Sequence, residues 1–195
     1  MKKILALMSA FLAVQMMACA SAESWDEVIG QKAPEISLIC ADGTPFSLYE
    51  ALDEKDLAVV CLFGSGCGAC RKELRALDKA YRLYEDRVAV IGLSLDRTRD
   101  TPEVLCSFQE AEGLTFPLGK DPVRTARFLK INMYPAFMIV SAIGEVVYVE
   151  VNGPASIDHF VELFDTCLDG ASPADAESDF GTVCTGDSCL IPEDV

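Results

Sequence analysis

Histidine and basic residues are scarce in this chain. The 195 residues include a single histidine, His159, which excludes a metal site built from several histidines. Only 16 lysines and arginines stand against 31 acidic residues, so the formal net charge is -15. Because such a surface repels a phosphate backbone, we expect no nucleic-acid partner and interpret the acidity as a solvated surface.

The first apolar segment is too short to span a membrane. The run at residues 4–18 falls below the roughly 20 residues that a spanning helix needs. It follows two lysines and precedes Ala20-Ser21-Ala22, an order typical of a secretory signal peptide at residues 1–22. A second interpretation stays open, because residues 16–19 resemble a lipobox in which Cys19 would be lipidated and would tether the protein to a membrane.

Cysteine, in contrast, is abundant, with nine residues in the full sequence. An even number remains if Cys19 is removed or lipidated, which suggests disulfides in an exported protein. The chain after the signal peptide is long enough for one domain with a core of its own. We predict this domain at residues 33–168 and a polar tail outside the core at residues 169–195, where apolar periodicity is lost.

Strands and helices alternate along the predicted domain. Apolar runs predict buried strands at residues 57–63 and 88–95, and turn dipeptides predict hairpins of residues 36–40 with 45–48 and of residues 136–140 with 146–151. Helical spacing or capping residues predict helices from residue 67 onwards and at residues 101–112, 121–130 and 156–168. This order indicates an α/β fold with a mixed central sheet flanked by helices.

The motif Cys67-Gly68-Ala69-Cys70 lies where a buried strand meets the start of a helix. The unpaired N–H groups and the dipole at a helix start stabilise a thiolate, so we expect Cys67 to be the more exposed cysteine of the pair and a nucleophile with a low pKa. Cys70, one turn into the helix, would resolve the mixed disulfide. A structural disulfide or half of a zinc site are the alternatives, but zinc needs two further ligands.

A second pair, Cys184 and Cys189, stands in the polar tail with C-x4-C spacing. The pair could close a small disulfide loop that pins the tail, or it could form a second redox pair that relays electrons to Cys67. As zinc ligands these two cysteines have the wrong spacing and position.

Several motifs, in order, resemble those of TlpA/ResA-type redoxins, exported thioredoxin-like thiol–disulfide oxidoreductases of the AhpC/TSA-redoxin superfamily. The resemblance spans residues 33–168. It is carried by Ala33-Pro34, Asp42-Gly43, residues 58–73, Ser94-Leu95-Asp96, Thr115-Phe116-Pro117, Asp121-Pro122, Tyr134-Pro135 and Gly144-Glu145.

The resemblance implies a thioredoxin fold with an N-terminal β-hairpin and an inserted strand and helix. It also implies a location in the periplasm or cell envelope. Proteins of this type reduce disulfides in exported proteins, often apocytochrome c, and are recharged by a membrane thiol carrier. Neither the motifs nor the resemblance calls for a cofactor or a metal.

Three further site residues follow from the resemblance. Pro135 matches the cis-proline of a loop that faces the cysteine pair and presents backbone groups to a substrate peptide, and Tyr134 before it would contact the substrate. Glu73 matches a carboxylate near the thiols, which could exchange protons with Cys70. The alternative for Glu73 is a solvated charge on the helix.

The sequence departs from the family pattern at several positions. Gly66 stands where a tryptophan is usual before the first cysteine, and Ala136 replaces the usual threonine after the proline, so substrate preference stays open. Cys61 stands where thioredoxins often bury an acid; we interpret it as a small core residue, with a third-thiol role as the alternative. Cysteines without an assigned partner could pair in three ways among themselves: Cys40, Cys61, Cys106 and Cys167.

Two other functions are compatible with the cysteines. A thiol peroxidase shares the fold, but Gly64-Ser65-Gly66 replaces the Thr-x-x that would precede its reactive cysteine. A metallochaperone for Cu(I) would use the thiols as soft ligands, normally together with a histidine or a methionine. The lead hypothesis is therefore an extracytoplasmic thiol–disulfide oxidoreductase.

Overall fold

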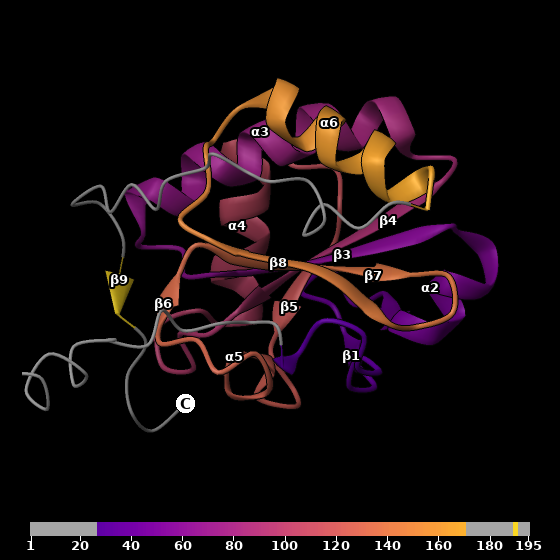
Figure 1. Cartoon of the computed structure of the whole chain (residues 1–195). Coiled ribbons are helices and arrows are strands. Elements are labelled where there is room, and N and C mark those ends of the chain that lie inside the picture. The colour runs from indigo at the N-terminus through magenta and orange to yellow at the C-terminus, as the bar shows by residue number, and fades with distance from the viewer. Residues whose placement is uncertain (1–26, 171–188, 191–195) are drawn as a thin grey trace, which may run out of the picture.

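A computed structural model of the chain describes residues 27–170 and 189–190 (Figure 1). The predictions for the signal peptide, Cys19 and Cys184 fall outside these residues. Across the two described ranges, no helix has both the length and the apolar character that membrane crossing requires.

The core is a mixed sheet of five strands in the order β5-β4-β3-β7-β8. The central strand pairs in parallel with β4 and antiparallel with β7, and all seven of its residues are buried, as its continuous apolar sequence predicts. The predicted mixed α/β sheet is therefore confirmed. The strands are β3 (Leu57–Phe63), β4 (Val88–Ser94), β5 (Leu118–Lys120), β7 (Ala136–Ser141) and β8 (Val146–Val151).

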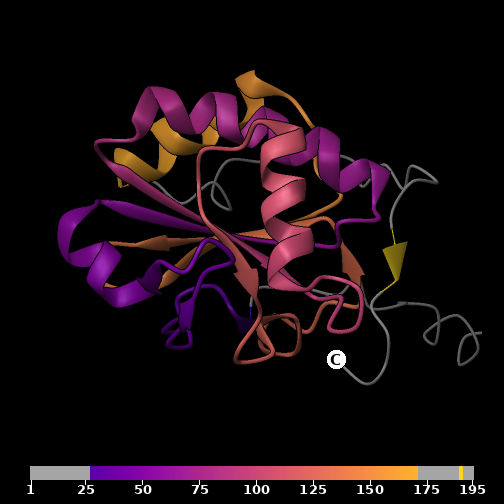
Figure 2. The same cartoon turned by 180° about the vertical axis from the view of Figure 1, so that it is seen from behind.

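Helices cover both faces of the sheet (Figures 1 and 2). The long helix α3 (Gly68–Tyr84) lies on one face together with α4 (Pro102–Glu112) and α6 (Ile157–Leu168). The short helix α5 (Thr125–Phe128) lies on the opposite face. Along the chain, helix α4 and strand β5 come between β4 and α5, in keeping with the inserted strand and helix that the resemblance implies.

The predicted N-terminal hairpin is present as β1 (Ser37–Ile39) and β2 (Pro45–Ser47), which pair antiparallel. It ends one residue earlier than predicted, because the Ser47 hydroxyl accepts a hydrogen bond from the Glu50 N–H and so caps a helix that was not predicted, α2 (Leu48–Glu54). The hairpin packs on the sheet where Leu38 contacts Gly119 of β5.

Helix α5 is shorter than the predicted helix at residues 121–130. The Asp121 carboxylate accepts hydrogen bonds from the N–H groups of Val123 and Thr125 and from the Thr125 hydroxyl, so the chain turns before the helix begins. Arg124 and Lys130 have φ of 57° and 54°, which breaks the right-handed helix at both ends.

The segment at the end of the chain differs most from the prediction. Its residues Cys189–Leu190 form a short strand, β9, which pairs antiparallel with β6 (Met133–Tyr134). Tyr134 lies opposite Cys189 and Met133 opposite Leu190. Two residues of the predicted free tail therefore contact the domain, next to the predicted substrate-binding residue Tyr134 (Figure 1).

Candidate active site

Cys67 and Cys70 form a disulfide at the start of α3, with their Cα atoms 5.3 Å apart. The predicted strand–cysteine–helix arrangement is present, because β3 ends at Phe63 and Cys67 is the N-cap residue of the helix. The Cys70 N–H donates a hydrogen bond to Cys67 Sγ at 3.1 Å. The sulfur thus takes the place of the oxygen that usually caps a helix, where negative charge is stabilised.

Neither sulfur-bearing residue is open to solvent in this oxidised form. Cys67 is 1% exposed and Cys70 is 0% exposed. In the disulfide state the exposures of the two cysteines are therefore nearly equal, while Gly66 and Gly68 on either side of Cys67 are exposed. The greater exposure of Cys67 in the reduced protein stays a prediction. A macromolecular substrate can reach Cys67 only after a local rearrangement.

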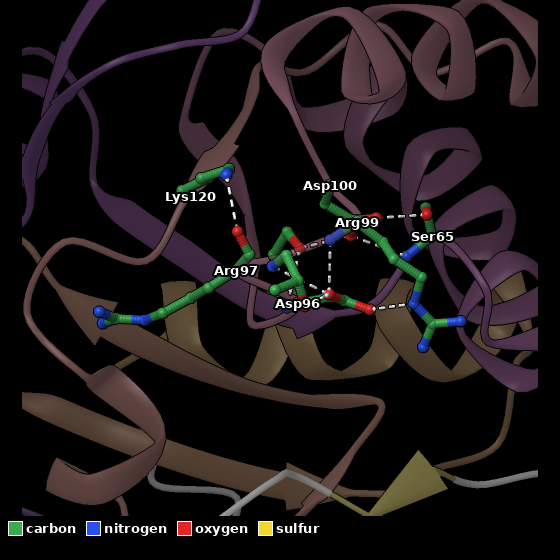
Figure 3. A network of polar contacts seen from close by, with 8 residues as sticks. Ser65, Asp96, Arg97, Arg99, Asp100 and Lys120 are labelled. Atoms are coloured by element: carbon green, nitrogen blue, oxygen red, sulfur yellow. Dashed lines mark hydrogen bonds and ion pairs between the residues drawn. The ribbon is translucent and has the colours of Figure 1, made fainter. Parts of the chain in front are cut away.

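A buried carboxylate fixes the loop that leads into Cys67 (Figure 3). Asp100, which is fully buried, accepts hydrogen bonds from the Ser65 N–H, from the Ser65 hydroxyl and from the Ser94 hydroxyl. The loop is thereby tied to the end of β4. Sequence reasoning missed Asp100 and Ser65, and only the motif Ser94-Leu95-Asp96 drew attention to this segment.

Two arginines, Arg71 and Arg99, lie next to the loop that contains Ser65 and Gly66. Arg71 donates a hydrogen bond to the Ser65 carbonyl at 2.9 Å, and its guanidinium lies over the Phe108 ring, 5.4 Å from the centroid. Arg99 forms an ion pair with Asp96 at 2.7 Å (Figure 3). The backbone before the cysteine pair is therefore held from both β4 and α3.

Tyr134 and Pro135 lie beside the cysteine loop, where the resemblance predicts them. The peptide bond between them is cis, as expected. Ala136 pairs with Leu62, so the preceding residues lie alongside the end of β3 and the loop that follows it. The Tyr134 ring approaches Gly64 so closely that a Cβ there would lie 3.0 Å from its hydroxyl oxygen. Gly64 in turn accepts a hydrogen bond from the Cys67 N–H.

Glu73 is buried on α3, one turn after Cys70. It is 1% exposed, and neither carboxylate oxygen has a hydrogen-bond partner among the described residues. Burial, and secondarily the negative charge of Glu150, raises the pKa of Glu73 to about 8. The alternative of a solvated helix charge is therefore wrong, and the carboxyl group can gain or lose a proton near neutral pH.

Two other titratable groups, Cys61 and Glu150, interact electrostatically with Glu73. Cys61 in β3 is fully buried, and burial followed by the nearby Glu73 raises the pKa of its thiol well above the usual value. A thiol that stays protonated is a poor nucleophile, which supports the interpretation of Cys61 as a core residue. A hydrogen bond of 2.6 Å joins Glu150 Oε2 to His159 Nε2, and both side chains are mostly buried.

Four further cysteines of the domain, Cys40, Cys61, Cys106 and Cys167, are free. None of the three pairings among Cys40, Cys61, Cys106 and Cys167 is formed. The Cys184–Cys189 pair stays a prediction, because Cys184 lies outside the described residues. Within residues 27–170 and 189–190, no three histidine, cysteine or acidic side chains gather as metal ligands.

Comparison with known proteins agrees with this geometry. Residues 29–149 match the AhpC/TSA family. The chain belongs to the AhpC/TSA family. Together with the sheet and the Cys67–Cys70 disulfide, this match identifies a thioredoxin-like redoxin and supports an oxidoreductase activity.

Individual relatives carry names for thioredoxin-like, peroxiredoxin and thiol-disulfide oxidoreductase proteins. Thioredoxin-like protein YneN of Bacillus subtilis is 27% identical over 122 residues, which are 63% of this chain and 71% of that protein. A putative peroxiredoxin of Mycobacterium tuberculosis is 33% identical over 95 residues, 49% of this chain and 58% of the relative. The thioredoxin domain of a thiol-disulfide oxidoreductase from Bacteroides vulgatus is 26% identical, with a TM-score of 0.59, over 72% of this chain and 97% of that structure.

The buried carboxyl of Glu73 predicts a specific dependence of stability on pH. Its pKa rises from 4.5 to about 8 on folding, so between these values the unfolded chain releases a proton that the folded protein keeps. The free energy of unfolding should therefore fall as pH rises across this window, by up to about 1.4 kcal/mol per pH unit from this group. Glu73→Gln should remove that component in denaturant titrations of the oxidised protein between pH 5 and 8.

The matched control is Glu85→Gln, which changes an exposed glutamate just after the same helix. We expect this control to keep the wild-type dependence on pH. Equal slopes for wild type and Glu73→Gln would show that Glu73 is not protonated in the folded state.

Proposed function

We propose that this protein is an extracytoplasmic thiol–disulfide oxidoreductase that reduces disulfides in exported proteins. The observation that carries the proposal is the Cys67–Cys70 disulfide at the N-terminus of α3, with the cis peptide bond of Tyr134-Pro135 beside its loop. The family match and the relatives named for thioredoxin or thiol-disulfide oxidoreductase support it.

The reaction begins from the reduced pair. The Cys67 thiolate, stabilised by the Cys70 N–H and the helix dipole, attacks one sulfur of a substrate disulfide. A bond forms between Cys67 and that sulfur, the substrate disulfide breaks, and the other substrate sulfur leaves as a thiolate. Cys70 then loses its proton and attacks Cys67 Sγ, which releases the second substrate thiol and closes the Cys67–Cys70 disulfide.

Glu73 is the proposed proton acceptor for Cys70. Residues three apart in a helix share one face, and both side chains are buried on the same side of α3. A carboxyl group with a pKa of about 8 can take a proton from a thiol and return it at near-neutral pH. No other described carboxylate on α3 combines this burial with this place one turn after Cys70.

The substrate segment would bind as an extended peptide beside Tyr134 and Pro135. The backbone there borders the loop of Gly64, and an extended partner pairs through main-chain groups with limited dependence on side chains. The exposed Gly66 leaves room next to the site, because a Cβ at this position would meet only the Arg99 guanidinium, at 3.9 Å. Substrates with bulky residues next to the cysteine would fit this opening.

The proposed location and partners rest on the sequence. The signal-peptide pattern at residues 1–22 and the TlpA/ResA-type motifs support a role in the periplasm or cell envelope, with lipid anchoring through Cys19 as one form of it. A membrane thiol carrier would then recharge the Cys67–Cys70 pair with electrons, and apocytochrome c would be among the protein substrates.

Substitution of the two cysteines should separate their roles. Cys70→Ser, expressed in the native host, should accumulate mixed disulfides on Cys67, because the thiol that resolves them is missing. Cys67→Ser should trap nothing, and both variants should lose insulin reduction by on the order of 10²-fold or more. Mass spectrometry of the trapped adducts would identify the substrates and the direction of exchange.

The control for this experiment is Cys106→Ser, since Cys106 is a free and partly exposed cysteine of α4. It should retain wild-type activity. Adducts formed on Cys106 or Cys70 instead of Cys67 would contradict the proposed order of attack.

The role of Glu73 has a kinetic signature. In Glu73→Gln, which keeps the volume of the side chain but cannot accept a proton, resolution of the mixed disulfide should slow by about 10²-fold near pH 8, where a large fraction of the Glu73 carboxyl groups is ionised. The rate of initial attack by Cys67 should change much less. Stopped-flow measurement of both steps, with Glu85→Gln as control, checks this; an equal effect on both steps would indicate a structural role for Glu73.

A thiol peroxidase is the second candidate, favoured by the similarity to the putative peroxiredoxin. The geometry argues against it. A threonine three residues before the reactive cysteine would stand at Gly64, where a Cβ would already lie 3.0–3.1 Å from the Tyr134 ring. A copper chaperone has less support, because the described residues contain no group of three or more histidine, cysteine or acidic side chains placed to hold a metal ion.

Peroxide consumption distinguishes the two oxidoreductase functions. The purified, reduced protein should reduce insulin while oxidising its Cys67 thiol with hydrogen peroxide no faster than an ordinary accessible thiol. Rapid, stoichiometric loss of peroxide, abolished in Cys67→Ser, would establish the peroxidase instead.

A further inference from the structure

The pairing of β9 with β6 places part of the chain itself at the proposed peptide-binding edge. Strand β6 is not part of the five-stranded sheet, and its described partner is β9 alone. The backbone N–H and C=O groups along the edge of a strand can pair with an extended segment. The segment that does so is Cys189–Leu190, with Cys189 directly opposite Tyr134.

We propose that Cys189–Leu190 is a tethered occupant of the substrate edge, which a protein substrate must displace before its disulfide can reach Cys67. The inference rests on the proposed function, because it assigns a regulator to the same site. The bound segment has the chemistry that the site would accept from a substrate: an extended backbone in which a cysteine is followed by an apolar residue, Leu190.

The length of the connection allows this binding. Twenty residues separate the end of α6 at Leu168 from β9, enough to span about 70 Å when extended. Attachment to the same chain gives the segment an effective concentration on the order of millimolar at a nearby site. Weak main-chain pairing is then sufficient to keep the edge occupied for a large fraction of the time.

The burial of Cys67 is consistent with an occupied site. Cys67 is only 1% exposed in this disulfide form, so a protein partner has no direct access to its sulfur in this structure. If a tethered segment must leave first, the apparent dissociation constant for a substrate is the intrinsic value divided by the fraction of molecules in which the edge is free. Small disulfides, which need no strand pairing, would be affected less.

The test compares two double variants of the full mature chain that lose the same side chains. Cys189→Pro/Leu190→Pro removes both backbone N–H groups of β9 and so prevents its pairing with β6. Cys189→Ala/Leu190→Ala removes the side chains but keeps these N–H groups. In hydrogen-exchange mass spectrometry, peptides covering Met133 and Tyr134 should exchange faster in the proline variant and at the wild-type rate in the alanine variant.

Kinetics give the second measurement. The proline variant should show a KM for insulin about two- to tenfold lower than wild type, with unchanged kcat and an unchanged rate with the small disulfide DTNB. Equal exchange at Met133 and Tyr134 in the two double variants, or equal KM values, would overturn the proposal. If the wild-type protein reduced neither DTNB nor insulin, the proposed function would be overturned instead. The hydrogen-exchange comparison would still test whether β9 pairs with β6.

Discussion

The hydrogen bond from the Cys70 N–H to Cys67 Sγ is the contact on which the chemistry of this site depends. It exists because β3 ends at Phe63 in a fully buried position and α3 begins five residues later, so that a sulfur occupies the N-cap. The loop between them has little freedom, since Asp100 holds Ser65 from one side and Arg71 holds it from the other. A helix start that is fixed in this way directs the partial positive charge of its Cys70 N–H group at Cys67 Sγ.

The buried face of α3 contains a second constraint. Cys70, Glu73, Leu74 and Leu77 are spaced as one helical face, and all four are buried against the sheet. A carboxyl group without a hydrogen-bond partner among the described residues is costly in such a place, and it avoids the larger cost of a buried charge by keeping its proton up to a pKa of about 8. A leucine would pack there at lower cost, so stability alone does not explain a glutamate at this position.

Much of the fold could be predicted from local sequence patterns. The continuous apolar runs gave β3 and β4, and Thr101, Pro102 and Gly113 gave both ends of α4, because each signal acts through the residues beside it. Short elements were predicted less well: the bounds of α5 depend on where the Asp121 side chain bonds, and β9, which was not predicted, depends on a partner more than 50 residues away. The cysteine pair was clear from its motif, but the burial of Cys67 and Glu73 and the role of Asp100 arise from tertiary packing that no local pattern encodes.

The four free cysteines have a consequence for biogenesis. Three of them, Cys40, Cys61 and Cys167, are buried, and burial raises the pKa of each of these thiols. Once the domain has folded, an oxidase therefore finds few reactive thiolates apart from the functional pair. In the oxidising location that we propose, the same thiols would be accessible before folding, so the yield of correctly paired protein would depend on whether the domain folds before these thiols are oxidised.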